Sequence, residues 1–127
     1  MDVFDISTTP TRIAAAHGET IYEIVGRTLG RRTESHSVAH VAIAPGKSSL
    51  RHFHPEAEES YYILAGSARI EVGHETATLR PGHIVLIPPP LPHKIYNAGR
   101  SHLLLLVVCV PAWEPTNTVW LESPRES

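Results

Sequence analysis

Short apolar runs rich in β-branched residues recur along the chain, and Gly and Pro separate them. Runs of this length, bounded by turn residues, indicate β-strands rather than helices. The expected strands cover residues 21–25, 36–44, 60–64, 68–72, 76–79, 84–87, 93–96 and 103–110. Several short strands with frequent turns are typical of sandwiches and barrels, so we predict an all-β fold.

The length of the chain, 127 residues, suits one hydrophobic core. We therefore expect a single domain over residues 1–127. Its core should span about residues 20–112, with an extension at each end. Residues 121–127 contain mostly polar side chains and are predicted to be a frayed tail.

Composition narrows the class of partner. The chain has 11 basic and 13 acidic residues and no basic run, which argues against nucleic acid and anionic membranes as partners. The longest apolar run, residues 103–110, is far shorter than the roughly 20 residues needed to span a bilayer. The single cysteine, Cys109, cannot form an internal disulfide, and the acidic N-terminus does not resemble a signal peptide. We predict a cytoplasmic protein.

Alternation along the strands predicts which side chains share a face. If Glu59 points inward, Tyr61 and Ile63 should do the same, with Tyr62 and Leu64 outside. Residues 103–110 show no alternation, which is typical of a strand covered on both faces. A packed second sheet or a homodimer interface would provide that cover, and we favour a homodimer.

Four side chains form the strongest chemical signal: His52, His54, Glu59 and His93. Imidazole nitrogens together with one carboxylate suit divalent transition metals. On a strand, residues i and i+2 point to the same face about 6.6 Å apart, so His52 and His54 can chelate one ion together. If the four side chains converge, they form a metal site.

Glycines and prolines extend this pattern over residues 46–97. The first half reads Gly46, five residues, His52-x-His54, four residues, Glu59, six residues, Gly66. The second half reads Gly82, five residues, Pro88-x-Pro90, two residues, His93, three residues, Asn97. The two halves resemble the two signature motifs of the cupin superfamily. Residues 54–66 are also similar to the small single-domain cupins grouped as mannose-6-phosphate-isomerase-like, a label that implies no such activity.

The resemblance implies a cupin fold, a double-stranded β-helix or jelly-roll barrel of two antiparallel sheets. It also implies one divalent transition metal per chain, with His52, His54, Glu59 and His93 as its ligands. Two positions depart from the pattern. Pro90 stands where Gly is normal and is expected to alter only the turn before His93. His83 stands where Asp is common, and its role stays open.

Other residues near the motifs have alternative interpretations. Glu58 and Glu56 are also close to His54, but Glu59 keeps the six-residue gap to Gly66 and is preferred. Asn97 is either a catalytic amide or, by preference, a residue that hydrogen-bonds the backbone.

Two further residues, Tyr61 and His40, are candidates for a catalytic role. Tyr61 should face the metal cavity, where its phenol can act as an acid, a base or a hydrogen-bond donor, or simply form part of the wall. His40, beside Val38 and Ala42, is either a base or partner near the metal or a plain core or rim histidine.

Three histidines and one carboxylate leave two positions of an octahedral ion open, and open positions are what catalysis needs. We predict a metal-dependent enzyme that acts on a small-molecule substrate, although whether it is an enzyme stays open. Fe(II) is favoured and would support a dioxygenase-like oxidation. With Zn, Mn or Ni, the chemistry would be that of an isomerase, cyclase, lyase or decarboxylase. A non-catalytic cupin that binds a metal or small ligand is the other alternative, although sensing cupins are usually fused to a DNA-binding domain.

Overall fold

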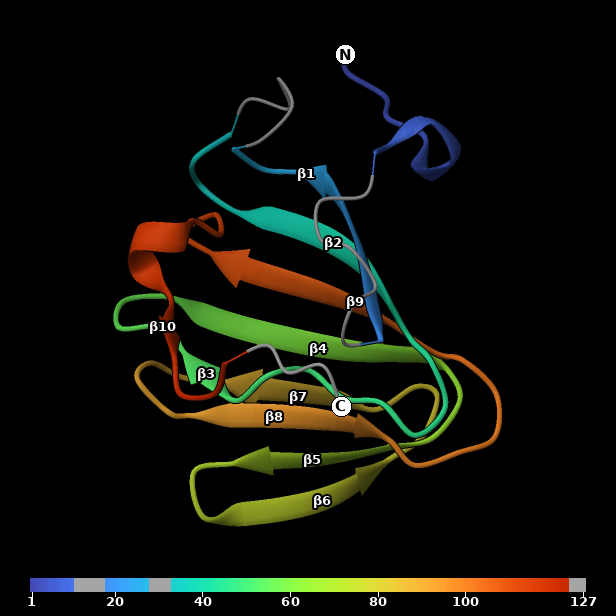
Figure 1. Ribbon diagram of the computed structural model, residues 1–127. Helices are drawn as coiled ribbons and strands as arrows, with labels where there is room; N and C mark the ends of the chain where they lie inside the picture. The colour runs from blue at the N-terminus through green and yellow to red at the C-terminus, as the bar shows by residue number, and fades with distance from the viewer. Residues whose placement is uncertain (11–17, 28–32, 124–127) are drawn as a thin grey trace.

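The protein is built from two five-stranded antiparallel sheets (Figure 1). The structure, a computed structural model, describes residues 1–10, 18–27 and 33–123. The first sheet has the order β1 (Glu19–Val25), β2 (Ser37–Ile43), β9 (Leu103–Val110), β4 (Glu58–Ala65) and β7 (Ile84–Ile87). The second has the order β10 (Val119–Trp120), β3 (His52–Phe53), β8 (His93–Asn97), β5 (Ala68–Val72) and β6 (Glu75–Leu79). Two short 3-10 helices, η1 (Ile6–Thr8) and η3 (Pro115–Asn117), complete the described elements. The all-β prediction is confirmed.

The eight predicted strands agree with the observed ones to within two residues at each end. The predictions missed β3 and β10, which have two residues each and are too short to show periodicity. No helix among the described residues is long and apolar enough to cross a membrane.

The core lies between the two sheets, where alternate side chains of each strand meet. On β4, Glu59, Tyr61 and Ile63 are buried, whereas Tyr62 and Leu64 are 40% and 39% exposed, as the alternation predicted. The most deeply buried apolar side chains come from both sheets and include Ile43, Ile63, Ile87, Ile95, Leu103 and Leu105.

Strand β9 occupies the centre of the first sheet, between β2 and β4. Its inward side chains Leu103, Leu105 and Cys109 are buried, while Leu104 and Leu106 on the outer face are only half-buried. The second sheet therefore covers one face of this strand. The other face of an unusually apolar strand stays partly open.

The C-terminal segment lies at the edge of the second sheet, where β10 pairs with β3. The backbone N–H of Leu121 donates to the carbonyl of Arg51, and the backbone N–H of Arg51 donates to Oε1 of Glu122 at 2.8 Å. Glu122 also pairs with Lys94 at 2.9 Å. The frayed tail expected over residues 121–127 therefore does not begin at residue 121, and residues 124–127 lie outside the described part of the chain.

Candidate metal centre

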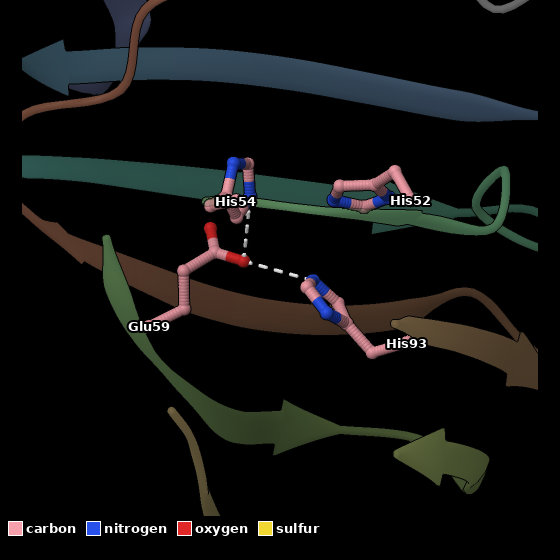
Figure 2. A group of neighbouring side chains, drawn as sticks. All are labelled: His52, His54, Glu59 and His93. Carbon is pink, nitrogen blue, oxygen red and sulfur yellow. Dashed lines mark hydrogen bonds and ion pairs between the residues drawn. The ribbon is translucent and has the colours of Figure 1, made fainter. Parts of the chain in front are cut away.

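Strands of both sheets bring His52, His54, Glu59 and His93 together (Figure 2). His52 on β3 pairs directly with His93 at the start of β8. His54 follows β3, and Glu59 lies near the beginning of β4, next to Cys109 of β9. One ligand atom from each of the four residues lies within 4.8 Å of the others. The structure thus brings together the four residues that the sequence pattern singled out.

All four side chains are buried, with exposed fractions of 8% for His52, 3% for His54, 4% for Glu59 and 1% for His93. Burial of polar and ionisable groups costs free energy unless they are paired, hydrogen-bonded or bound to a metal. The cluster therefore needs partners for its nitrogen and oxygen atoms.

Backbone carbonyls provide partners for one side of each imidazole. The Nδ1 atoms of His52, His54 and His93 lie 2.7 Å, 2.9 Å and 3.0 Å from carbonyl oxygens. These carbonyls belong to Leu50, Asn117 and Leu91, respectively. Because a carbonyl oxygen can only accept a hydrogen bond, each Nδ1 must carry the proton. Each Nε2 is then the nitrogen left to face the cluster, which is how metal-binding histidines are usually oriented.

The carboxylate of Glu59 lies between two of these nitrogens. Its Oε1 is 3.0 Å from Nε2 of His93 and 3.1 Å from Nε2 of His54 (Figure 2). The His54 contact lacks hydrogen-bond geometry, so this buried Nε2 has no hydrogen-bond partner among the described residues. A buried nitrogen of this kind, beside a carboxylate and two further imidazoles, fits a divalent transition metal.

The surroundings shift the pKa values of His52 and Glu59 toward the forms that bind a metal, and that of His54 in the opposite direction. Burial lowers the pKa of His52 to about 4, and the neighbouring His93 adds to the effect. Burial acts to raise the pKa of Glu59, but its short contacts with His54 and His93 and their charges outweigh it and hold that pKa at about 2. Burial would lower the pKa of His54, but its contact with Glu59 outweighs burial and raises it. Near neutral pH the site therefore holds a neutral His52 and an ionised Glu59.

Tyr61 lies beside this cluster and is 5% exposed. Its Oη is 3.5 Å from Oε1 of Glu59, and its ring meets the ring of His93 edge-on at 5.8 Å. Burial, followed by the negative charge of Glu59, raises the pKa of Tyr61 well above its ordinary value. The phenol therefore keeps its proton and serves as a donor.

The cluster opens into a cavity of about 320 Å³ between the sheets. Its walls are mostly apolar, and the residues that line it are Glu19, Ile21, Glu23, Ser37, Ala39, Val41, Leu50, His52, His54, Glu59, Tyr61, Ile95, Leu105, Val107, Cys109, Trp113 and Trp120. An apolar cavity with a few convergent polar groups is the usual form of a small-molecule site.

The structure does not bring every candidate to this cavity. His40 lies on the outer face of β2, where its ring meets that of Tyr22 at 6.5 Å, whereas its neighbours Ala39 and Val41 line the cavity. The placement agrees with a rim histidine and not with a base beside the four clustered residues. Asn97 is buried away from the cavity and donates to the carbonyls of Ile43 and Ser101, each at 2.8 Å, which agrees with the backbone-bonding alternative.

The remaining candidates lie on the surface. Glu56 and Glu58 are exposed, so Glu59 is the acidic residue of this segment that joins the cluster. His83 is exposed, and its Nδ1 accepts a hydrogen bond from the backbone N–H of Arg80 at 3.0 Å. Pro90 lies in the turn before His93, as expected.

Sequence reasoning did not assign several polar and aromatic cavity residues to the site, among them Glu19, Glu23, Trp113 and Trp120. The ring of Trp120 lies 5.1 Å from that of His52, and Thr118 approaches Nδ1 of His54 at 3.3 Å. The C-terminal segment thus forms part of the wall. A pair of tryptophans just beyond the last predicted strand was the signal that could have indicated this.

Comparison with known proteins agrees with the family resemblance of the two sequence motifs. The family model described as Cupin domain matches residues 39–109. The uncharacterized protein MJ1618 of Methanocaldococcus jannaschii is 35% identical over 86 residues, which cover 68% of this chain and 69% of that protein.

Solved structures share the fold at lower identity. The nucleoside dehydratase Pac13 aligns with a TM-score of 0.80 at 13% identity, and the alignment covers 99% of this chain and 95% of the Pac13 chain. An oxalate decarboxylase from Lactobacillus farciminis aligns with a TM-score of 0.79 at 24% identity, and the alignment covers 93% of this chain and 35% of the decarboxylase chain. At such identities the likeness concerns the fold alone, and it agrees with the predicted jelly-roll barrel.

Proposed function

This chain belongs to the cupin family, and we propose that it is a metal-dependent enzyme that acts on a small organic molecule. One observation carries the proposal. Three imidazoles, each fixed by a backbone carbonyl, converge with a carboxylate beside an apolar cavity, and His52, His54 and Glu59 line that cavity. A closed structural metal site would not need such a cavity, whereas a catalytic site needs room for a substrate beside the metal.

His52, His54, Glu59 and His93 would hold one divalent transition metal, with Fe(II) favoured over Zn, Mn or Ni. When bound, the metal would supply a Lewis acid or, as Fe(II), a redox centre for reactions with dioxygen. The carbonyls of Leu50, Asn117 and Leu91 keep the Nδ1 proton on each imidazole and so direct each Nε2 toward the ion.

The other cavity residues would bind the substrate and exclude water. Apolar side chains from both sheets, such as Val107 and Ile95, form most of the wall. Tyr61 presents a protonated phenol 3.5 Å from Glu59, so it can donate a hydrogen bond or a proton to a substrate oxygen near the ligands.

The first reaction that we propose is a dioxygenase-like oxidation with Fe(II). Four protein ligands on an octahedral ion would leave two positions for small molecules, and the apolar walls would limit side reactions with water.

Tyr61 favours a second candidate, in which the metal is not redox-active and the phenol moves a proton during an isomerisation, elimination or decarboxylation. A dehydratase and a decarboxylase share this fold, which supports this class of reaction as an alternative.

The experiment that tests the proposal is elemental analysis of protein purified without added metal, followed by assays with phenolic and keto-acid substrates. About one equivalent of a transition metal per chain and oxygen consumption would support the oxidation. Turnover under strict anaerobiosis would exclude the oxygenase and favour the second candidate. A loaded metal without turnover of any substrate would favour a binding protein.

We also propose that the protein forms a homodimer through the outer face of the first sheet. Tyr62 and Leu64 of β4 are 40% and 39% exposed there, and Ile84 and Leu86 of β7 are 64% and 61% exposed. The half-buried Leu106 of β9 continues this surface. A contiguous apolar face of this kind is typical of an interface between subunits.

A further inference from the structure

Strand β1 presents acidic side chains to the interior of the cavity. Its inward residues are Glu19, Ile21 and Glu23, all of which line the cavity, and Glu23 is only 1% exposed. A carboxylate this deeply buried is rare and requires hydrogen-bond donors around it. Inward positions of a strand normally carry apolar side chains, so two acidic residues out of three make this part of the cavity wall unusually polar.

The pairing of the strands places Glu23 across the cavity from the metal ligands. Glu23 pairs with Ala39 of β2, Ala39 pairs with Val107 of β9, and Val107 pairs with Tyr61 of β4. Glu23 and Tyr61 therefore lie in one row of the sheet, separated by three strand spacings, or about 14 Å between backbones. The small side chains of Ala39 and Val107 form the floor between them.

The space around Glu23 depends on a neighbouring glycine. A Cβ atom at Gly26 would lie 2.8 Å from Oε2 of Glu23 and 3.0 Å from Cβ of Ser37. A larger residue would therefore push the carboxylate from its place. Ser37 also lines the cavity, and its Oγ accepts a hydrogen bond from the backbone N–H of Trp113 at 3.0 Å. Glu23, Ser37 and Trp113 thus define a polar end of the cavity with an aromatic wall.

The cavity consequently has two unlike ends. The end lined by His52, His54 and Glu59, with His93 beside them, would attract oxygen atoms of a ligand once a metal is bound. The end at Glu23 offers carboxylate oxygens that can accept hydrogen bonds from a ligand. A carboxylate can accept about four hydrogen bonds, so Glu23 can accept one from a ligand in addition to contacts within the protein.

We propose that Glu23 is a specificity-determining residue that accepts a hydrogen bond from an O–H or N–H group at the far end of the substrate. This inference rests on the proposed function, because the other end of the substrate is taken to face the metal. The substrate class is a ring-sized organic molecule with a metal-binding oxygen group at one end and a hydrogen-bond donor at the other. A second carboxylate at the far end would meet the oxygens of Glu23 with no hydrogen atom to donate.

The size of the cavity agrees with this class. A protein cavity of about 150 Å³ accommodates benzene. The cavity here measures about 320 Å³, which leaves room for one ring with substituents at opposite positions. The side chains of Trp113 and Trp120 can contact the face or edge of such a ring.

The test compares three probes that differ only at the position opposite a shared carboxylate: para-hydroxybenzoate, para-toluate and terephthalate. Binding is measured by calorimetry on protein loaded with zinc, which is not redox-active. We expect para-hydroxybenzoate to bind about ten-fold more tightly than para-toluate, because its hydroxyl donates to a charged acceptor. Terephthalate should bind most weakly.

The Glu23→Gln variant keeps the shape of the side chain and removes its charge. We expect it to lower the preference for para-hydroxybenzoate over para-toluate and to improve the binding of terephthalate. The matched control is Glu75→Gln, on an exposed part of β6, which should leave all three affinities unchanged.

An unchanged order of affinities in Glu23→Gln would overturn the inference. So would a wild-type protein that binds terephthalate as well as para-hydroxybenzoate or binds none of the probes, and neither result depends on a variant folding. Zinc stoichiometry is measured separately in each protein. If Glu23→Gln does not change the order of affinities but zinc binding is complete, only the inference about Glu23 is wrong and the proposed metal site is unaffected. A wild-type protein that binds no zinc would contradict the proposed function itself.

Discussion

Nε2 of His93 lies 3.0 Å from Oε1 of Glu59, and both groups are almost completely buried. An imidazole nitrogen and a carboxylate oxygen attract each other at this distance only if a cation lies between them or a proton is shared. A proton and a metal ion would therefore compete for the space between these two atoms.

We expect metal binding to release about one proton per ion near neutral pH, because the contact with Glu59 raises the pKa of His54 and the ion would replace the proton on its Nε2. Calorimetric titration of zinc into metal-free protein, repeated in buffers with different ionisation enthalpies, measures the number of protons released. A binding enthalpy that does not depend on the buffer would contradict this expectation.

Replacing His52 with Ala should remove the metal and leave the barrel folded. His52 is one of four ligands and lies at the end of the cavity, with its neighbours on β3 and β8 still able to pair. Elemental analysis measures the metal content of the variant, and circular dichroism shows whether its barrel is folded. His83→Ala is the matched control, because His83 is exposed and outside the cluster. If His52→Ala keeps full metal occupancy, His52 is not a ligand.

The metal-free protein should lose stability as the pH falls from about 6.5 toward 4. The pKa of His52 is about 4 in the folded protein, against 6.5 for a free histidine, so protons bind preferentially to the unfolded chain in this range. The loss should reach roughly 3 kcal/mol at most. The pKa of His54 is raised by folding, so its contribution is already fully present below pH 6.5 and does not change in this window. The contribution of Glu59 is lost only below about pH 4.5.

Denaturant unfolding at several pH values measures this slope. His52→Asn should flatten it, whereas His74→Asn, at an exposed turn, should not. Equal slopes in the wild type and His52→Asn would show that another group is responsible.

Tyr61→Phe should lower turnover by about a hundred-fold or more and leave the metal content unchanged, because the phenol supplies a proton but is not a ligand. Tyr62→Phe is a close control, since the next residue of β4 points to the outer face. Turnover with the substrate identified in the assays above, together with elemental analysis, separates the two roles. An active Tyr61→Phe enzyme would reduce Tyr61 to a wall residue.

Leu106→Glu should convert the proposed dimer into monomers, because it places a charge in the middle of the apolar outer face of the first sheet. Thr78→Glu introduces the same charge on the exposed β6 strand and should have no effect. Sedimentation analysis gives the mass in solution. A wild-type protein that sediments as a monomer at all concentrations would rule out this interface.

The strands and the four clustered residues could be predicted because each depends on local pattern. Turn residues separate the strands, and the spacing of His52, His54, Glu59 and His93 relative to glycines and prolines is regular over residues 46–97. The inward orientation of Glu59 and Tyr61 followed from simple alternation, because the polar and apolar residues of β4 differ clearly between its faces.

Other features of the site depend on information that alternation does not contain. Strand β2 carries apolar residues on both faces, such as Val38 outside and Val41 inside, so the face of His40 could not be assigned from the pattern. Glu19 and Glu23 would normally be assigned to solvent, because acidic residues rarely point into a core. Only the pairing of β1 with β2 shows that they point inward.

The hydrogen bond between His54 and the carbonyl of Asn117 joins positions that are 63 residues apart in the chain. During synthesis, the four clustered residues emerge before η3, the segment whose Asn117 carbonyl fixes the imidazole of His54. A nascent chain that lacks η3 (Pro115–Asn117) would therefore hold an incompletely oriented set of donors, and selective loading with an ion would follow translation of the last turn rather than precede it.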